Sequence, residues 1–491
     1  MCPPRSSIPW RRNPAAPGES LERSGYDSGV HPRAVRRTAI AVALIVLAAA
    51  AFAAGYAYRV ALVGAGFAAK NVCSSVFVSE REPSEALADL GAYRSAPLDR
   101  VRVVVDRAGR SVTAVLAGIA RRTAVYRDGL GCVLAIDASV AALAGVMLPP
   151  TAARPDAPWP NGETDTPASP GAALARVLDD AFAEHAGGLP KRTRAVVVVH
   201  DGRIVAERYA PGITRATRLP GWSMAKSVTA ALVGALAAEG ALDPEAPARL
   251  AVWRAPNDAR AAITPAQLLR MSSGLAFDES YANPLSDVVV MLFGTGDAAG
   301  FAAAKPLAHA PGTRWAYASG TTNVLMRLAR ERIGDDRAYL AFPRRALFDP
   351  IGMASAVFET DASGTFVGSS LLYATARDWA RFGLLVLNEG RWNGRRVLPE
   401  QWVAFMRAPA PAAPEGEYGA HWWLKLEANR GPRARPRALP ADAFHAAGHG
   451  GQFVTIVPSR RAVVVRLGHA VDRGAWDQDE FAAAVLEALA R

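Results

Sequence analysis

Residues 221–232 read GWSMAKSVTAAL and place a serine, Ser223, three positions before a lysine, Lys226. The apolar run that follows predicts a helix that begins near Ser223, and residues three apart on a helix share a face. A serine there meets backbone N–H groups without helical partners, and the positive end of the helix dipole disfavours a protonated lysine. The pair is a candidate nucleophile and base. Because an S-x-x-K match is frequent by chance, the alternative is a serine cap followed by a surface lysine.

Two further motifs follow this pair along the chain. Tyr317 occurs in RWAYASGTTNVL, with Ser319 two residues later, just before a predicted apolar helix. His449 occurs in AAGHGGQFVTIV, where Gly450 and Gly451 open a predicted strand. In this order, S-x-x-K, Y-x-S and H-G-G point to nucleophilic catalysis on a serine.

The three motifs together resemble those of the penicillin-recognising serine hydrolases. These comprise the class C β-lactamases, the D-Ala-D-Ala peptidases, and related esterases and amidases. The stretch LLRMSSGLAF (268–277) is also similar to that family, and the resemblance covers residues 172–491, the predicted hydrolase domain. A serine in Y-x-S and a histidine in H-G-G are most similar to the 6-aminohexanoate-dimer hydrolases and related carboxylesterases.

The resemblance implies a mechanism. Ser223 attacks a carbonyl carbon and becomes acylated, while Lys226 and Tyr317 take the seryl proton and pass it to the leaving group. An unperturbed tyrosine, with a pKa near ~10, is a poor base at neutral pH, so the Lys226 ammonium is expected to lower the pKa of Tyr317. The backbone N–H groups of Ser223 and Gln452 would form the oxyanion hole. Ser319 is expected to hydrogen-bond within the site.

The H-G-G motif and an aromatic residue complete the predicted site. Gly450 and Gly451 are expected to let the substrate approach the strand edge closely, beside His449. Tyr281, in FDESYANP, and the HWW stretch at 421–423 are candidates for the wall of the acyl pocket. Packing within loops is the alternative for these last residues.

The sequence departs from the family pattern at two places. β-Lactamases and penicillin targets usually carry Y-x-N and K-T-G, where this chain has Ser319 and His449-Gly450-Gly451. The lysine of K-T-G helps to bind the substrate carboxylate, so its absence favours neutral esters or linear amides. The alternatives are a β-lactamase or D-Ala-D-Ala peptidase, and a catalytically silent envelope protein that reuses the fold for binding.

The hydrolase region is predicted to be α+β. Residues 194–212 form two strands around Asp201-Gly202, a strong hairpin signal, and residues 451–468 again read as strand, turn and strand. Helices are predicted at 172–186 and 477–490, with others between the two hairpins. Strands and helices from both ends of the region then form one antiparallel sheet flanked by helices, with a helical subdomain inserted, similar to β-lactamases and transpeptidases.

A membrane segment is predicted near the start of the chain. Residues 38–58 contain no charged residue and are long enough to cross a hydrocarbon core of roughly 30 Å. Arg33, Arg36 and Arg37 precede them, which keeps the basic, disordered tail of residues 1–37 in the cytoplasm and the hydrolase on the periplasmic side. The alternative is a signal peptide cleaved after AFA, which would give a secreted protein.

Two cysteines follow the predicted membrane segment. Cys73 and Cys132 lie in a compartment that is expected to be oxidising, which predicts a disulfide between them; two buried thiols are the alternative. Residues 99–136 alternate apolar and polar positions and predict short strands, so residues 59–148 are expected to form a small β-rich domain. A Pro-rich linker, 149–171, follows.

Composition argues against several other functions. The formal net charge is +11, but the arginines are scattered, so nucleic-acid binding is not expected. The chain has no H-E-x-x-H or C-x-x-C motif, and no metal or other cofactor is predicted. Gly64-Ala65-Gly66 with Ala69 imitates a dinucleotide fingerprint, but it follows a predicted membrane segment instead of a strand. The expected partners are therefore a small ester, amide or peptide substrate and the membrane.

Overall fold

The computed structural model of the protein describes residues 32–93, 98–149, 156–164, 169–426, 438–472 and 474–490. The chain divides into two units, Met1–Tyr56 and Ala57–Arg491, and all predicted site residues belong to the second. Residues 1–31 of the predicted tail, and parts of the predicted linker, lie outside the described residues.

The first described element is the long helix α1 (Pro32–Cys73), which a π-helical segment, Ser74–Val78, extends. Residues 36–59 are exposed, whereas Ala65, Ala68 and Val72 are fully buried. The predicted span 38–58 is therefore helical, but the helix starts earlier and continues beyond it. This corrects the expectation that the β-rich region begins at residue 59. Within the described residues, this helix alone is long and apolar enough to cross a membrane.

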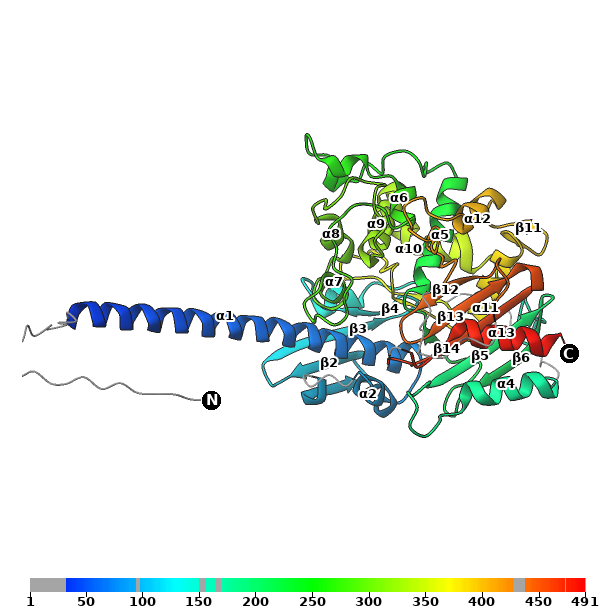
Figure 1. The fold of residues 1–491 in the computed structure, drawn as a ribbon, viewed down its shortest axis with the longest axis horizontal. Coiled ribbons are helices and arrows are strands. Elements are labelled where there is room, and N and C mark those ends of the chain that lie inside the picture. The colour runs from blue at the N-terminus through cyan, green and yellow to red at the C-terminus, as the bar shows by residue number, and fades with distance from the viewer. Residues whose placement is uncertain are drawn as a thin grey trace, which may run out of the picture. The chain divides into compact units, whose positions relative to one another are not determined.

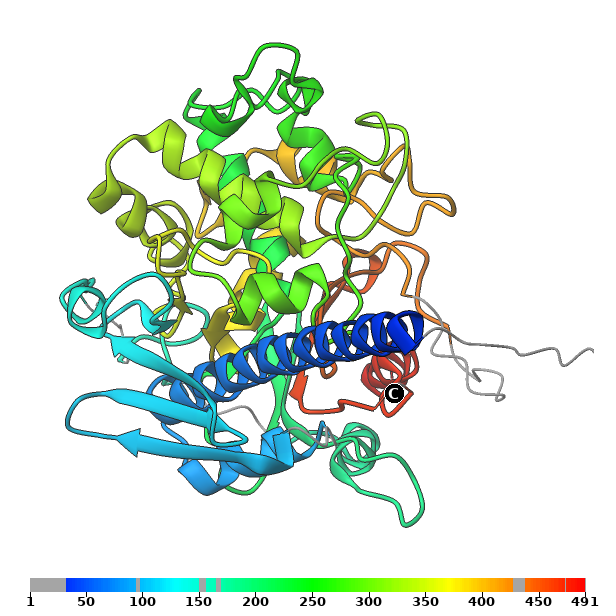
Figure 2. The ribbon, with the colours of Figure 1, turned by 90° about the vertical axis from the view of Figure 1, so that its left-hand side faces the viewer.

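The predicted short strands form a separate antiparallel sheet in the order β1-β2-β3-β4 (light-blue strands in Figure 2). The strands are β1 (Val101–Asp106), β2 (Ser111–Leu116), β3 (Ala120–Arg127) and β4 (Gly131–Leu134). Helix α2 (Pro83–Gly91) precedes them and α3 (Val140–Ala144) follows. Alternate residues of β2 are buried because successive side chains on a strand point to opposite faces. This sheet belongs to the same unit, Ala57–Arg491, as the hydrolase; its independence as a domain stays a prediction.

Buried polar contacts join the end of α1 to the hydrolase region. Lys70 forms an ion pair with Glu359, and both side chains are almost completely buried. Glu359 also accepts hydrogen bonds from the Ser74 hydroxyl (2.8 Å) and from the Cys132 backbone N–H (2.7 Å). The Sγ atoms of Cys73 and Cys132 form a disulfide next to this cluster. One carboxylate thus holds the end of α1, the start of the π-helical segment and β4.

The larger sheet has five antiparallel strands in the order β12-β13-β14-β5-β6 (Figure 1). Two strands come from the start of the hydrolase region, β5 (Thr193–His200) and β6 (Arg203–Tyr209). Three come from its end: β12 (Phe444–Gly448), β13 (Gln452–Val457) and β14 (Ala462–Gly468). Both predicted hairpins are present, and β5 pairs with β14, which joins the two ends of the region.

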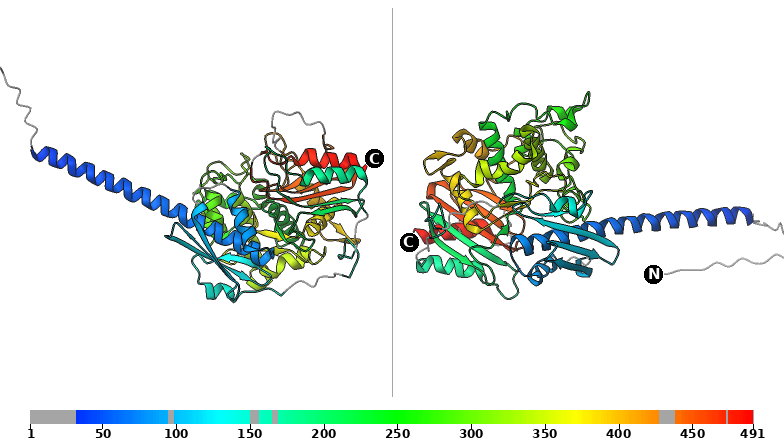
Figure 3. Two further views of the ribbon diagram at one scale, coloured as in Figure 1. Left: turned by 90° about the horizontal axis from the view of Figure 1, so that it is seen from below. Right: turned by 180° about the vertical axis from the view of Figure 1, so that it is seen from behind.

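Helices cover both faces of this sheet. Helices α4 (Ala172–Phe182) and α13 (Gln478–Leu489) lie side by side on one face (Figure 3), where they pack on Val196 and Val198. Helix α11 (Ala376–Leu387) covers the other face, and Val197 and Val199 point into that layer. The alternation of the strand side chains thus divides the core into two layers. The predicted α+β architecture is confirmed.

The remaining elements lie mainly between β6 and β12 in the chain and form the helical part of the hydrolase. The helices are α5 (Met224–Ala238), α6 (Pro265–Leu269), α7 (Asp287–Phe293), α8 (Ala298–Ala303), α9 (Ser319–Ile333), α10 (Asp336–Pro343) and α12 (Glu400–Arg407). Short 3-10 or π-helical turns occur at Leu98–Arg100, Ala251–Trp253, Ala259–Ala262, Arg344–Phe348 and Pro458–Arg460. There are also two small sheets in the described chain. One contains β7 (Leu219–Pro220), β9 (Leu372–Ala374) and β8 (Val357–Phe358). The other contains β10 (Arg391–Trp392) and β11 (Arg395–Arg396).

The Lys70–Glu359 pair predicts a stability change. Substitution of Lys70 by Met leaves a buried carboxylate without its counter-charge, so we expect Lys70→Met to lower the free energy of unfolding by about 3–5 kcal/mol. Arg345→Met is the matched control, since Arg345 pairs with Glu239 on the surface and its loss should cost less than about 1 kcal/mol. Denaturant unfolding of the full chain in detergent measures both. Equal losses in the two variants would contradict the importance of the buried pair.

Candidate active site

Ser223 lies at the start of the buried helix α5. Trp222, just before it, has a positive φ of 47°, and Gly221 N donates to Leu372 O of β9 at 2.8 Å, so the chain turns sharply from β7 into the helix. Nearly all residues of α5 are buried, which explains why this helix is apolar on every side. The Ser223 side chain makes no capping hydrogen bond to the helix. Its hydroxyl is therefore available for other contacts.

The Lys226 amine is buried beside Ser223. Its Nζ lies 2.9 Å from Ser223 Oγ, 3.0 Å from Ser319 Oγ and 3.1 Å from Ser369 O. Burial lowers the pKa of Lys226 to about 8, although the negative charge of Glu279 raises it in part. A neutral amine has two N–H groups and one lone pair. When the N–H groups donate to Ser319 and Ser369, the lone pair faces Ser223 Oγ.

Tyr317 contacts both members of this pair. The Lys226 Nζ lies 4.8 Å from the centroid of its ring, and its hydroxyl interacts with the Ser223 side chain. Burial raises the pKa of Tyr317, the charge of Glu279 raises it further, and only the Ser223 hydrogen bond lowers it. The prediction that Lys226 lowers this pKa is therefore wrong. Tyr317 is a neutral phenol in this environment, and its hydroxyl is suited to giving up a proton to a strongly basic leaving group.

A carboxylate that the sequence analysis missed lies behind Lys226. This carboxylate is Glu279. It accepts hydrogen bonds from the backbone N–H (2.7 Å) and from the hydroxyl (2.6 Å) of Ser319, the first residue of helix α9. A carboxylate at a helix N-terminus is favoured by the helix dipole. Burial raises the pKa of Glu279, and the charge of Lys226 opposes this shift. The only sequence signal was an acidic residue two positions before Tyr281.

The site opens into a cavity of about 380 Å³. Many of the side chains that line it are aromatic. The lining residues are Ser223, Glu279, Tyr281, Tyr317, Trp423, Leu426, Ala447, Gly448, His449, Phe453, Trp476, Asp477 and Gln478. The structure thus brings together the predicted Ser223, Tyr317, Tyr281 and His449, with Lys226 and Ser319 beneath them. None of the lining residues within the described part of the chain is Arg or Lys. The same part contains no group of three or more His, Cys, Asp or Glu side chains arranged for a metal ion.

His449 forms one wall of this cavity. Its ring stacks on Tyr281, with centroids 5.6 Å apart, and meets Trp222 edge-on at the same distance. Burial lowers the pKa of His449 to about 4. The imidazole is therefore neutral at pH 7 and offers no positive charge to a substrate carboxylate.

Two predicted roles in the H-G-G segment need correction. Gly450 and Gly451 have φ values of 72° and 78° and form the turn between β12 and β13, so they serve the turn and not the strand edge. The side chain of Gln452 holds this turn, since its Nε2 donates to His449 O, Gly450 O and Gly468 O. Gln452 does not line the cavity. The prediction that the Gln452 N–H faces the oxyanion is therefore not supported.

Strand β12 passes close to Gly221, the residue before Trp222. A Cβ on Gly448 would lie 2.1 Å from Gly221 O, so only glycine fits at this crossing. The His445 N–H donates to Trp423 O, away from β13. Because N–H directions alternate along an antiparallel strand, the N–H group of Ala447 also points away from β13, and His449 follows directly after the strand.

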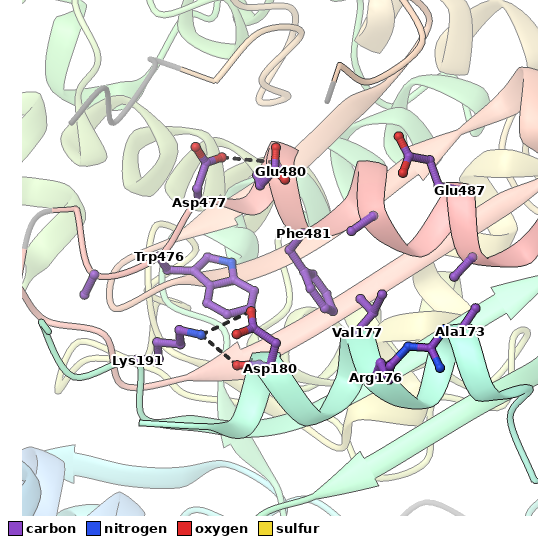
Figure 4. Close-up of a pocket in the computed structure, with 13 residues that line it drawn as sticks. Ala173, Arg176, Val177, Asp180, Lys191, Trp476, Asp477, Glu480, Phe481 and Glu487 are labelled. Atoms are coloured by element: carbon purple, nitrogen blue, oxygen red, sulfur yellow. Dashed lines mark hydrogen bonds and ion pairs between the residues drawn. The ribbon is translucent and has the colours of Figure 1, made fainter. Parts of the chain in front are cut away.

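A larger cavity, of about 490 Å³, lies between α4 and α13 (Figure 4). Charged side chains rim it, among them Arg176, Lys191, Glu480 and Glu487, and Lys191 donates to Asp180 O at 2.6 Å. Its described lining residues include no serine, cysteine or histidine. It therefore offers no serine or cysteine nucleophile among its described lining residues, whereas Ser223 lines the other cavity.

Comparisons with known proteins agree with these motifs. A 6-aminohexanoate-dimer hydrolase from Paenarthrobacter ureafaciens is 27% identical over 282 residues, which cover 52% of this chain and 71% of that protein. Similar solved structures include a family VIII carboxylesterase (19% identity, 64% of this chain and 94% of that chain, TM-score 0.48). They also include a penicillin-binding protein from Bacillus halodurans (17% identity, 64% of this chain and 99% of that chain, TM-score 0.46).

A family model described as Beta-lactamase matches residues 178–488, which is more than half of the chain. The match contains the whole constellation of Ser223, Lys226, Tyr317 and His449. The resemblance noted in the motifs is confirmed, and the chain belongs to the β-lactamase family of serine hydrolases.

Proposed function

We propose that the protein is a membrane-anchored serine hydrolase that cleaves neutral esters or linear amides through an acyl-enzyme on Ser223. The observation that carries this proposal is the buried Lys226 amine, 2.9 Å from Ser223 Oγ. A lysine with a pKa of about 8 is partly neutral at physiological pH, which a surface lysine is not. This environment argues against a silent binding protein.

The first half-reaction uses these groups in turn. Lys226 accepts the seryl proton, and Ser223 Oγ attacks the substrate carbonyl carbon to form a tetrahedral intermediate. As the carbonyl re-forms, the leaving alkoxide or amine takes a proton from the Tyr317 hydroxyl, and the Lys226 ammonium returns one to Tyr317. Water then attacks the acyl-enzyme, and the proton transfers run in the reverse order. The water gives a proton to Tyr317 as Tyr317 gives one to Lys226, and the Lys226 ammonium then protonates the leaving Ser223 Oγ.

The negative charge on the carbonyl oxygen needs two N–H donors. The first is the backbone N–H of Ser223 at the start of α5, where helical N–H groups lack partners. We assign the second to the backbone N–H of His449, which makes no backbone hydrogen bond in the described structure and belongs to a residue that lines the cavity. His449 also contacts Trp222, the residue before the nucleophile.

The cavity favours an uncharged acyl group. Aromatic side chains, among them Tyr281, Trp423 and Trp476, form much of its wall, and the neutral His449 replaces a cationic residue. The similar 6-aminohexanoate-dimer hydrolase is named for a linear amide, which supports cleavage of linear amides. A β-lactam or D-Ala-D-Ala substrate, the alternative, brings a carboxylate without an evident cationic partner among the described lining residues.

The anchor is the exposed part of helix α1. Its most apolar window has a mean hydropathy of 2.4 and is unburied, as expected of a lipid-facing segment. Three arginines before it favour a cytoplasmic N-terminus, which puts the hydrolase on the periplasmic side. A cleaved signal and a secreted enzyme are the alternative, and the N-terminal sequence of the mature protein distinguishes the two.

Ser223→Ala tests the covalent step. We expect this variant to lose ester hydrolysis and labelling by a fluorophosphonate probe, because Ser223 lines the cavity and its Oγ lies 2.9 Å from Lys226 Nζ. Its thermal midpoint should stay within about 2 °C of wild type, since the Ser223 side chain makes no capping hydrogen bond. Full activity in a clean Ser223→Ala preparation would refute the acyl-enzyme.

The pH dependence tests the base. Only neutral Lys226 accepts a proton, so kcat/KM for a p-nitrophenyl ester should rise with pH through about 8, the lowered pKa of Lys226. The charge of Glu279 raises this pKa, so Glu279→Gln should move the rising limb to lower pH. Lys226→Met should lose about 10²–10⁴-fold in kcat/KM and show no such limb.

His449 cannot produce that limb, because its pKa is about 4. The measurement is therefore a pH profile of kcat/KM for wild type and the two variants, with Glu239→Gln as a control for loss of a remote surface carboxylate. A limb near pH 8 that persists in Lys226→Met, or a Glu279→Gln limb that moves to higher pH, would mean that another group is the base.

Substrate choice is the third test. We expect kcat/KM for a short p-nitrophenyl ester to exceed that for nitrocefin by at least about tenfold, or roughly 1.4 kcal/mol of transition-state discrimination. The physical reason is that none of the described lining residues offers a cation to the β-lactam carboxylate. Steady-state kinetics of both substrates on one preparation measure the ratio. A preference for nitrocefin would make the β-lactamase reading the correct one.

A further inference from the structure

A tyrosine from outside the family match completes the wall around His449. The ring of Tyr93, just after α2, lies parallel to the His449 imidazole, with centroids 5.7 Å apart and an interplanar angle of 8°. Tyr281 also stacks nearly parallel to the imidazole, at 21°. His449 thus has two stacked aromatic neighbours, one of them from a region that the family model does not cover.

Tyr93 is itself held from two sides. Its ring meets Phe67 of α1 edge-on at 5.2 Å and His469, which follows β14, at 5.5 Å. The Nε2 of His469 lies 3.0 Å from Asp89 O of α2. The Asp89 carboxylate in turn pairs with Arg194 of β5. Helix α2 is thereby attached to the larger sheet at the place where Tyr93 reaches His449.

We propose that Tyr93 is a positioning residue for the substrate cavity, and that residues 57–93 therefore form part of the enzyme's specificity apparatus. Tyr93 acts on the substrate through the side chain of His449, which lines the cavity with Tyr281. The backbone of His449 is held separately, because Gln452 Nε2 donates to His449 O at 3.0 Å. Loss of the Tyr93 ring then loosens the imidazole of His449, which forms one wall of the cavity, without moving the backbone N–H of His449 that we propose as an oxyanion donor.

This separation predicts a particular kinetic signature, which rests on the proposed esterase function. In Tyr93→Leu, KM for p-nitrophenyl butyrate should rise about three- to tenfold, the size of one lost aromatic contact, while kcat changes less than about twofold. Tyr93→Phe keeps the ring and should behave like wild type. The measurement is steady-state kinetics of the full chain in detergent.

Tyr126→Leu is the matched control for general destabilisation. Tyr126 lies in β3, also outside the family match, and stacks on Phe77 at 5.6 Å, but it does not line the cavity. It should lower the thermal midpoint by an amount similar to Tyr93→Leu and leave KM unchanged. An equal rise of KM in both variants would overturn the proposal, since it would show a nonspecific effect of loosening the region.

A double-mutant cycle tests whether Tyr93 acts through His449. In a His449→Leu background, Tyr93→Leu should change KM by less than about twofold, because coupled neighbours are not additive. Full additivity would overturn the proposal.

A second readout needs no turnover. Carbethoxylation of His449 at pH 7, followed by mass spectrometry, should be several-fold faster in Tyr93→Leu than in wild type or Tyr126→Leu. Unchanged labelling would overturn the positioning role, whereas a wild type inactive on all esters would refute only the proposed function.

Discussion

The site depends on one buried amine. Lys226 is 1% exposed and reaches three oxygens that come from three parts of the chain: Ser223 before α5, Ser319 at the start of α9, and Ser369 in the loop before β9. The loop itself is held by α9, since Ser369 N donates to Asn323 Oδ1 at 3.1 Å. Removing a lysine from water disfavours its charged form, so the same packing that assembles the site also lowers the pKa of its base. Structure and reactivity therefore have a common cause here: the closure of α5 and α9 around Nζ.

Glu279 limits how far that shift can go. Burial alone would lower the pKa of Lys226 further, and the carboxylate behind Ser319 raises it again. Ser319 lies between the two charges, as it accepts a hydrogen bond from Lys226 and donates one to Glu279. An asparagine at this position could also bridge the two groups, through its amide oxygen and its amide N–H, but with a larger side chain. The serine of the Y-x-S motif and the acidic residue at 279 are thus physically linked.

The sequence predicted features that depend on residues close together in the chain, and it missed contacts between residues far apart in the chain. Ser223 and Lys226 share a helical face by their spacing, and the Asp201-Gly202 turn is set by adjacent residues, so both were found. Glu279 reaches Ser319 across 40 residues, and no pattern in either segment shows this contact. The Gln452 assignment failed because two glycines in succession fit a strand edge and a tight turn equally well, and only the pairing of Gly448 with Gln452 distinguishes the two. The end of α1 was missed because its alanine-rich second half is buried on the hydrolase, a tertiary fact that its composition does not reveal.

Residues 57–134 make specific contacts with the hydrolase region. The family model starts at residue 178, yet Glu359, well inside it, has its counter-charge at Lys70, and His449 has a stacking partner at Tyr93. A hydrolase cut at residue 172 would lose Lys70 together with the Ser74 and Cys132 groups that contact Glu359, and the His449 ring would lose its contact with Tyr93. Loss of Lys70 alone from the full chain leaves the carboxylate buried without its counter-charge, which is strongly destabilising. The contacts made by residues 57–134 therefore connect the hydrolase region to the end of helix α1, and through Tyr93 they reach a residue that lines the cavity.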